Sequence, residues 1–303
     1  MLDVRRLRVL YEVAGHGSFS AAAAVLNVTQ SAVSQHVAAL EREVGLTVIE
    51  RGSRPVELTE AGHALVRHAA AIFARLDGAE QELGEIARRR RGRLRFGSFP
   101  TALATLAPPA FAHFRRSHAG VLLSVVDDHL QRLIPRLEAG ELDLALIYES
   151  DALPDVSARD LRRTPLLDDV YRVLLPRGHR LTRRRRALEL ADLAEEPWIG
   201  GSAVSAWYRI VREACRDSGF APAVEFSTDD HVAVQSLVVA GLGVAVVPGL
   251  AAAHPMPGLE VRALGSGAPV RRISAARPHD GYDGPAVTGM LESLDAAVAA
   301  MRT

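Results

Sequence analysis

Four polar residues near the start of an expected helix, Gln30, Ser31, Ser34 and Gln35, have side chains that suit contacts with DNA bases. Glutamine can form two hydrogen bonds with adenine, and a serine hydroxyl can bond to any base edge in the major groove. The four positions share the outward face of that helix near its N-terminus, which is the part of a recognition helix that contacts base edges. On composition alone, a solvated polar face is the alternative interpretation.

Catalytic chemistry has little support in the sequence. The chain contains no His-Glu-x-x-His, Gly-x-Ser-x-Gly or Gly-x-Gly-x-x-Gly motif, and all 36 basic residues are arginine, so no lysine is available for a Schiff base or a P-loop. Among the 11 histidines, the five-residue spacing of His63 and His68 places them about 140° apart around a helix. The adjacent acids Asp127-Asp128 and Asp168-Asp169 are expected in loops. We predict no enzymatic activity, no cofactor and no metal site.

One cysteine, Cys215, has no partner for an internal disulfide, so nothing in the sequence indicates an oxidising compartment. The N-terminus lacks the apolar segment of a signal peptide. The uncharged stretch 232–253 is long enough to span a bilayer, but its glycines and proline predict a helix ending near Gly241, a buried strand over 244–247 and a turn at Pro248-Gly249. We expect a soluble, cytoplasmic protein with no membrane partner.

The charge balance bears on how DNA would be bound. The chain has 303 residues, 48% hydrophobic and 24% charged, which is typical of a soluble globular protein of about two domains. Residues 1–58 contain as many arginines as acids. A DNA-binding segment without net charge depends on helix N-termini, on Arg51 and Arg54, and on two copies held together. A non-specific architectural DNA-binding protein, which needs a basic surface, is therefore disfavoured.

The first 58 residues predict short helices followed by a small hairpin. Ser18 suits the N-cap of a helix that ends at Leu26, and a further helix begins near Gln30, with Thr29 available as its cap. Two helices separated by a three-residue turn form a helix-turn-helix. Residues 48–51 and 56–58 flank a turn and predict a hairpin, or wing.

One long helix is expected from Thr59 to about Arg91, because apolar residues recur at alternating spacings of four and three. The residues of this seam are Leu65, Ala69, Ile72, Leu76, Ala79, Leu83 and Ile86. A helix packed on the core of its own domain is the alternative. We favour a dimerisation helix, because no strand or second long helix lies nearby in the sequence to cover the seam.

Beyond residue 92 the pattern changes to alternating strands and helices. Strands are predicted over 94–99, 121–127, 142–148, 170–175, 198–200, 224–227 and 244–247, and helices over 102–116, 130–139, 206–218 and 231–240. This alternation predicts an α/β architecture with largely parallel sheets. About 210 residues are more than one small sheet needs, which favours two lobes.

The helix-turn-helix segment carries a recognisable order of residues. These are Gly17-Ser18-Phe19-Ser20-Ala21-Ala22-Ala23, then Leu26-Asn27-Val28-Thr29-Gln30-Ser31-Ala32-Val33-Ser34-Gln35-His36-Val37, then Leu40-Glu41, Gly45-Leu46, Glu50-Arg51 and Leu58-Thr59-Glu60-Ala61-Gly62. The segment closely resembles the winged helix-turn-helix of the LysR-type transcriptional regulators. Two later segments also resemble that family, Gly140-Glu141-Leu142-Asp143-Leu144-Ala145-Leu146 and Ala240-Gly241-Leu242-Gly243-Val244-Ala245-Val246-Val247-Pro248.

The resemblance implies an α+β multidomain fold. It predicts a winged helix-turn-helix DNA-binding domain over 1–58, a linker and dimerisation helix over 59–91, and an effector-binding domain over 92–303 that resembles type 2 periplasmic binding proteins. Lobe I is expected at about 92–163 plus 267–303, and lobe II at about 164–266. The implied function is a regulator that binds an interrupted inverted repeat in double-stranded DNA and senses a small molecule between the two lobes.

The resemblance also assigns the DNA contacts. Gln30, Ser31, Ser34 and Gln35 fall at base-reading positions and Arg51 at a backbone-contacting wing position. The full predicted set is Ser18, Gln30, Ser31, Ser34, Gln35, Arg51 and Arg54. Many family members have proline at Ser31, phenylalanine at Ile49 and arginine at Gln35, and the last of these departures bears on which DNA sequence is preferred.

In the family, the effector lies between the lobes, at strand ends and helix N-termini. The corresponding residues here are Ser98, Phe99, Pro100, Thr101, Asp128, His129, Tyr148, Gly200, Gly201, Ser202, Thr228 and Pro248. Phe99, Tyr148 and Trp198 are candidate apolar walls. Ser98 and Thr101 either bind an anion at the helix N-terminus or only cap that helix. Because Asp128 disfavours a dianion, a monocarboxylate or an amino-acid-like molecule is the expected effector.

The expected partners are therefore DNA, a small-molecule effector, further copies of the chain in a dimer or tetramer, and RNA polymerase. A ligand-independent oligomeric regulator is one alternative. A cytoplasmic solute-binding protein is another, but such a protein would not need the first 91 residues.

Overall fold

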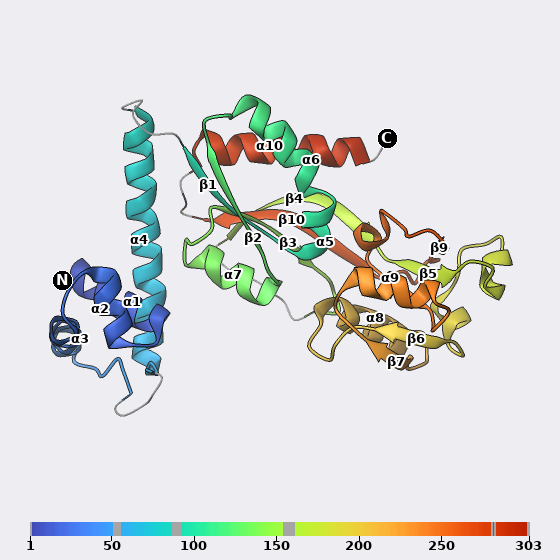
Figure 1. Cartoon of the computed structure of the whole chain (residues 1–303), viewed down its shortest axis with the longest axis horizontal. Helices are drawn as coiled ribbons and strands as arrows, with labels where there is room; N and C mark the ends of the chain where they lie inside the picture. The colour runs from blue at the N-terminus through green and yellow to red at the C-terminus, as the bar shows by residue number, and fades with distance from the viewer. Residues whose placement is uncertain are drawn as a thin grey trace.

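The computed structural model of the chain describes residues 2–50, 56–86, 92–153, 161–279, 281 and 283–301. Figure 1 shows a small helical N-terminal domain, the long helix α4 (Glu60–Ile86) and a C-terminal α/β region of two lobes. This arrangement agrees with the predicted multidomain α+β fold.

The N-terminal domain consists of α1 (Val4–His16), α2 (Phe19–Leu26) and α3 (Gln30–Val44). Its helix starts follow the sequence signals: the Ser18 side chain accepts a hydrogen bond from the amide of Ala21, and the Thr29 side chain accepts one from the amide of Ala32. Asn27 ends α2 in the left-handed region, with φ 54°. The predicted helix-turn-helix is therefore present.

Helix α4 contributes to the core of the N-terminal domain. Ala69 is fully buried there with Phe73, and Leu65 packs against the same cluster. The sequence pattern places Leu65 and Ala69 in a seam that faces a partner chain, and for these two residues that expectation is wrong, because their own domain covers them. Ile72, Leu76 and Leu83 are 36%, 50% and 65% exposed, and Ala79 is exposed as well. The side chain of Ile86 lies outside the described residues.

Lobe I is built on a five-stranded sheet in the order β2-β1-β3-β10-β4. The strands are β1 (Arg93–Ser98), β2 (Leu122–Asp127), β3 (Leu144–Glu149), β4 (Leu161–Val170) and β10 (Val270–Pro278). The helices are α5 (Pro100–Ala104), α6 (Ala107–Ser117), α7 (Leu130–Glu138) and α10 (Pro285–Met301). The helix predicted over 102–116 is divided in two, because Pro108 and Pro109 favour a new helix start.

Lobe II contains two small sheets that a bridge between Trp198 and Val244 connects. The strands are β5 (Arg172–Pro176), β6 (Pro197–Gly200), β7 (Ala223–Ser227), β8 (Ala245–Val247) and β9 (Leu259–Ala263), and the main helices are α8 (Ala206–Asp217) and α9 (His231–Val239). Short 3-10 helices are η1 (Arg180–Arg183), η2 (Leu190–Leu193) and η3 (Gly249–Ala252). The stretch 232–253 divides into α9, β8 and η3, and no helix of the described residues is suited to cross a membrane.

Strands β4 and β10 differ from two predictions, which concern the parallel sheets and the boundaries between the lobes. They pair antiparallel from Leu161–Pro278 to Val170–Val270, and β10 is also antiparallel to β3, while β5 is antiparallel to β8 and β9. The sheets are therefore not largely parallel. Because β4 stays in the sheet of lobe I to its end, the chain passes into lobe II at Tyr171 rather than near 164, and returns at Pro269 rather than near 266.

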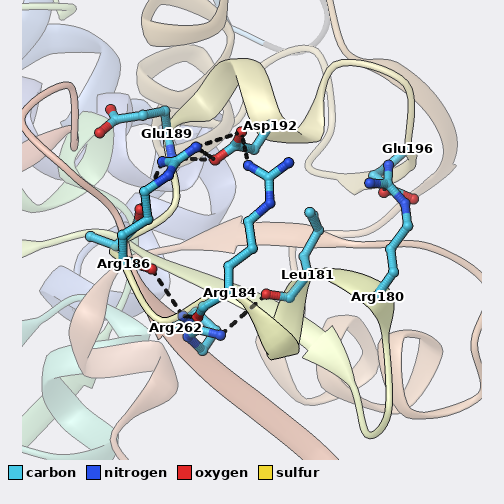
Figure 2. Close-up of polar contacts among 9 residues, drawn as sticks. Arg180, Leu181, Arg184, Arg186, Glu189, Asp192, Glu196 and Arg262 are labelled. Carbon is cyan, nitrogen blue, oxygen red and sulfur yellow. Dashed lines mark hydrogen bonds and ion pairs between the residues drawn. The ribbon is translucent and has the colours of Figure 1, made fainter.

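An arginine-rich surface loop of lobe II is held by the protein itself. Arg262 of β9 donates hydrogen bonds to the carbonyls of Leu181, Thr182, Arg184 and Arg186, and Figure 2 shows its guanidinium beneath the loop. Arg184 and Arg186 both pair with Asp192. These side chains fix the loop, so we assign them a structural role.

Lobe I docks onto the linker helix of the same chain. Gly140, with φ +68°, lies so close to α4 that a Cβ added there would be 1.9 Å from the Cβ of Ala74. The Tyr11 hydroxyl donates to a carboxylate oxygen of Glu141 at 3.2 Å. Only glycine fits this contact at position 140.

We predict that Gly140→Ala separates α4 from lobe I, because the new methyl group overlaps Ala74. Small-angle X-ray scattering of the full chain should show a larger radius of gyration. Gly178→Ala is the matched control: Gly178 also has a positive φ, +82°, but nothing lies within 4 Å of an added Cβ. Both variants carry a backbone cost of about 1–2 kcal/mol. Identical scattering of the two variants would contradict the prediction.

Candidate functional site

The first candidate site is the free face of α3. Gln30, Ser31, Ser34 and Gln35 are all exposed, as expected for residues that contact DNA. The Ser20 hydroxyl donates to the Gln30 side-chain oxygen at 3.1 Å, and the hydroxyls of Thr29 and Ser31 are 2.9 Å apart. Helix α3 lies on the side of the N-terminal domain away from α4 and the lobes (Figure 1). The face therefore has room for a duplex.

Of the other predicted DNA contacts, the structure describes Ser18 alone. Ser18 is half-buried, and its hydroxyl oxygen caps α2. Arg51 and Arg54 lie outside the described residues. The hairpin around them begins as predicted, since Ile49 forms a bridge with Leu58 and the amide of Glu50 donates to the carbonyl of Glu57 at 2.9 Å.

The second candidate site lies between the lobes and is centred on Arg271. This guanidinium is 2% exposed and donates to Asp169 at 2.8 Å and to the Thr101 hydroxyl at 2.6 Å. It lies 4.8 Å from the ring centroid of Phe99 and 4.9 Å from that of Tyr148, within cation–π range. The other oxygen of Asp169 accepts from the amide of Leu250 in lobe II at 3.0 Å. One ion pair thus touches both lobes.

Sequence reasoning missed both members of this pair. The sequence places Asp169 in a loop with Asp168, but it is 4% exposed in β4. Arg271 lies in β10, a strand that was not predicted. Neither β4 nor β10 alternates apolar and polar residues, and both carry several charged residues, so the sequence contains no local signal for the pair, whose members are 102 residues apart.

The predicted effector residues of lobe I differ in accessibility. Ser98, Phe99, Thr101 and Tyr148 are buried, whereas Asp128 is half-buried and Pro100 and His129 are exposed. Ser98 donates to the carbonyl of Phe99, and α5 has no side-chain cap. The alternative that Ser98 and Thr101 only cap this helix is therefore wrong: Thr101 holds Arg271 instead.

The predicted residues of lobe II surround the ends of β6 and β7. Gly200, Gly201 and Pro248 are buried, and Ser202 and Thr228 are half-buried. The Ser202 amide and hydroxyl both donate to Asp229, at 3.0 and 2.6 Å, and these bonds lower the pKa of Asp229, as does His129 of lobe I. Because His129 is close enough to act on Asp229, the two lobes face each other at this edge.

The aromatic wall is partly different from the prediction. Phe99 and Tyr148 pack edge to face, with ring centroids 4.9 Å apart. Trp198 belongs to the core of lobe II, where it is fully buried and its indole N–H donates to the carbonyl of Leu193. Trp207 is the tryptophan beside the site, since its ring lies 5.0 Å from that of His231.

Three of the buried polar atoms without a hydrogen-bond partner among the described residues belong to this region: the Tyr171 hydroxyl and His231 Nδ1, in two residues on which the charge of Arg271 acts, and the indole nitrogen of Trp207, whose ring lies beside His231. An unpaired buried polar group costs about 1–3 kcal/mol. Burial and the charge of Arg271 lower the pKa of His231 to about 4, so its ring is neutral near pH 7. Burial raises the pKa of Tyr171, so its hydroxyl keeps its proton. The tyrosine and tryptophan can therefore each donate a hydrogen bond to a ligand.

The described part of the chain contains no comparable cluster of residues for metal binding or for thiol chemistry. No group of three or more His, Cys, Asp or Glu residues there could hold a metal ion. Cys215 is fully buried, and burial raises the pKa of its thiol to about 12. A thiol with that pKa stays protonated and unreactive.

Comparisons with known proteins match both halves of the chain. Residues 4–63 match the family model described as "Bacterial regulatory helix-turn-helix protein, lysR family", and residues 87–299 match "LysR substrate binding domain". The HTH-type transcriptional regulator TtuA of Agrobacterium vitis is 30% identical over 82% of this chain and 80% of its own length. A probable hydrogen peroxide-inducible genes activator of Mycobacterium avium is 36% identical over 62% of this chain and 59% of its own length. A full-length variant of OxyR from Pseudomonas aeruginosa has a similar fold, with a TM-score of 0.74 and 24% identity over 97% of this chain and 95% of that one.

We predict that Ser34→Ala or Gln35→Ala weakens binding to a specific DNA site by about 1–3 kcal/mol, because each removes hydrogen bonds to base edges. Binding to random DNA should change little. Fluorescence anisotropy at one fixed salt concentration measures both, with a site selected from a random library. Ser117→Ala, an exposed serine in α6, should leave both affinities unchanged. Equal losses on both DNAs would show that α3 does not read bases.

We also predict that Asp169→Ala lowers the free energy of unfolding by about 3–5 kcal/mol, because it leaves the Arg271 guanidinium buried without its carboxylate. Urea denaturation of the full chain measures the change. Asp151→Ala removes the exposed carboxylate that pairs with Arg272 and should have little effect. A comparable, small effect of both substitutions would mean that the buried pair is dispensable.

Proposed function

Because the chain belongs to the LysR family of transcriptional regulators, we propose residues for each step by which it binds DNA and responds to an effector. The chain is a DNA-binding regulator with an effector-binding domain and is not an enzyme. Its helix-turn-helix domain is inconsistent with a solute-binding protein. We propose that it acts in the cytoplasm, where its DNA would be.

For DNA recognition, Gln30, Ser31, Ser34 and Gln35 of two subunits would read the two halves of an interrupted inverted repeat, with Ser18, Arg51 and Arg54 on the backbone. The exposure of the four α3 residues supports this assignment. Subunits would associate through Ile72, Leu76, Ala79 and Leu83, whose exposure on one side of α4 is unusual for apolar residues in a single chain. A dimer holds two weakly charged domains on one site, which raises their combined affinity.

The observation that carries the effector proposal is the set of unpartnered polar atoms between the lobes. The Tyr171 hydroxyl is a donor close enough to the buried Arg271 for its charge to act on the tyrosine, and the Trp207 indole nitrogen is a donor beside His231, on which the same charge acts. A carboxylate supplies acceptors for both. A monocarboxylate or an amino-acid-like molecule suits the site better than a dianion, because Asp128 and Asp229 add negative charge at its edge.

Helix α7 provides a route from this site to the N-terminal domain. His129 precedes α7 at the edge between the lobes, and Glu141 follows it. Glu141 accepts hydrogen bonds from Arg136 at 3.0 Å and from Tyr11 of α1 at 3.2 Å. An effector that changes how the lobes meet would shift α7 and, through Glu141 and Gly140, the docking of α1 and α4. Such a shift would change the spacing of DNA-binding domains and the access of RNA polymerase.

Ligand binding explains signalling in this chain better than thiol oxidation. One relative is named a hydrogen peroxide-inducible genes activator. Here the single cysteine, Cys215, is buried with a raised pKa and has no second cysteine to pair with. Peroxide reacts with thiolates. We therefore propose a bound small molecule as the signal.

We predict that a panel of monocarboxylates and amino acids contains a compound that stabilises the full chain in a thermal-shift assay, by roughly 2.7 kcal/mol at 100 times its dissociation constant. Tyr171→Phe should weaken that compound at least tenfold, because it removes one donor. Ser117→Ala, which removes an exposed hydroxyl of α6 outside the site, should bind it as the wild type does. A cooperative melt without any shift would favour the alternative, an oligomeric regulator that needs no ligand.

A further inference from the structure

A cavity of about 230 Å³ lies between the linker helix α4 and lobe I. The wall from α4 consists of Ala71, Ala74, Arg75 and Gly78, and the other wall comes from β1, the segment 138–143, the end of β10 and the start of α10. None of the residues assigned above to the inter-lobe site lines it. The cavity is therefore separate from that site, and it is complete only while lobe I is docked on α4.

The cavity and the exposed seam occupy different faces of α4. At 100° per residue, Ala71, Ala74 and Gly78 lie about 120–180° around the helix from Leu76 and Leu83. A second subunit that packs on the seam would leave the cavity open. The small side chains of the wall leave room for an apolar body, with Leu142 and Val287 on the opposite side.

The charged lining has a surplus of positive charge. Asp143 is occupied by Arg95, which donates to it through Nε and Nη2 and through its backbone amide. The Asp283 carboxylate forms ion pairs with two guanidinium groups, that of Arg162 at 2.8 Å and that of Arg277 at 2.9 Å. Arg93 is exposed and forms no ion pair with the described residues. Among all the lining residues, four arginines (Arg75, Arg93, Arg95 and Arg277) face three carboxylates (Glu138, Asp143 and Asp283), which leaves an excess of one positive charge.

We propose that this cavity is a second ligand site, which binds a small organic anion with its carboxylate at Arg93 and Arg277 and its apolar part against Ala71, Leu142 and Val287. Guanidinium groups match carboxylates with two parallel hydrogen bonds. The cavity lies just below the usual volume range of small-molecule sites, which limits the ligand to a compact one.

Binding there would stabilise the docked arrangement of α4 and lobe I. The ligand contacts both walls, so it has higher affinity for the docked chain, and docking and binding must strengthen each other by the same factor. This site would let an anion act on the DNA-binding half of the chain without entering the inter-lobe site, whether or not the proposed effector binds there.

The test is isothermal titration of the full chain with phenylacetate and hexanoate, each compared with its uncharged amide. Ala71→Trp fills the cavity from an exposed position of α4, and Arg93→Gln removes the cation that has no ion pair with the described residues. His68→Trp, an exposed residue of α4 that does not line the cavity, controls for the added indole. Thr101→Val reports on the inter-lobe site.

At least one carboxylate should bind saturably, and its amide should not. Ala71→Trp, Arg93→Gln and the undocking variant Gly140→Ala should each weaken binding at least tenfold, while His68→Trp and Thr101→Val leave it unchanged. Absence of saturable binding by either carboxylate, or equal binding of acid and amide, would overturn the proposal. Loss in Thr101→Val alone would also overturn it, and would place the anion between the lobes in agreement with the proposed function.

Discussion

Arg271 and Asp169 lie on the two antiparallel strands, β10 and β4, through which the chain passes between its lobes. A buried guanidinium and a buried carboxylate are tolerated only together, because an isolated charge in a protein interior is very costly. Arg271 also bonds to Thr101 in lobe I, and Asp169 also bonds to the Leu250 amide in lobe II. The position of the lobes relative to each other therefore depends on this pair. The charges of this pair act on Tyr171, one of the two unpartnered donors that suit a ligand, so the same pair also shapes the proposed effector site.

Different residues of helix α4 face three different surroundings: the core of the N-terminal domain, lobe I and the solvent. Ala69 and Phe73 complete the core of the N-terminal domain, Ala74 meets Gly140 of lobe I, and Leu76 and Leu83 remain exposed. A regular apolar spacing predicts that one face of a helix is buried, but it does not identify which part of the protein buries each turn of that face. This is why the predicted seam was right in its period and wrong in the partner of its first two residues.

The parts of the structure that depend on nearby residues were predictable. The caps Ser18 and Thr29, the turn at Asn27 and the break-up of the stretch 232–253 all follow from local chemistry. Strands β4 and β10 were missed because they carry several charged residues that become acceptable only through cross-strand partners about a hundred residues away. The same distance hid Arg271 and Asp169. Trp207 and His231 were missed because only the fold brings the starts of α8 and α9 together.

Strand β10 is the last strand of the chain, yet it lies between β3 and β4 in the sheet of lobe I. During synthesis, β4 leaves the ribosome about a hundred residues before the strand that joins it to β3. The N-terminal domain and the continuous lobe II can fold in that interval, whereas lobe I keeps open strand edges, which are prone to wrong pairing. A chain that ends before residue 270 would therefore carry an intact helix-turn-helix on α4 without a completed lobe I. In this topology, translation produces the helix-turn-helix domain well before it completes the lobe that docks on α4.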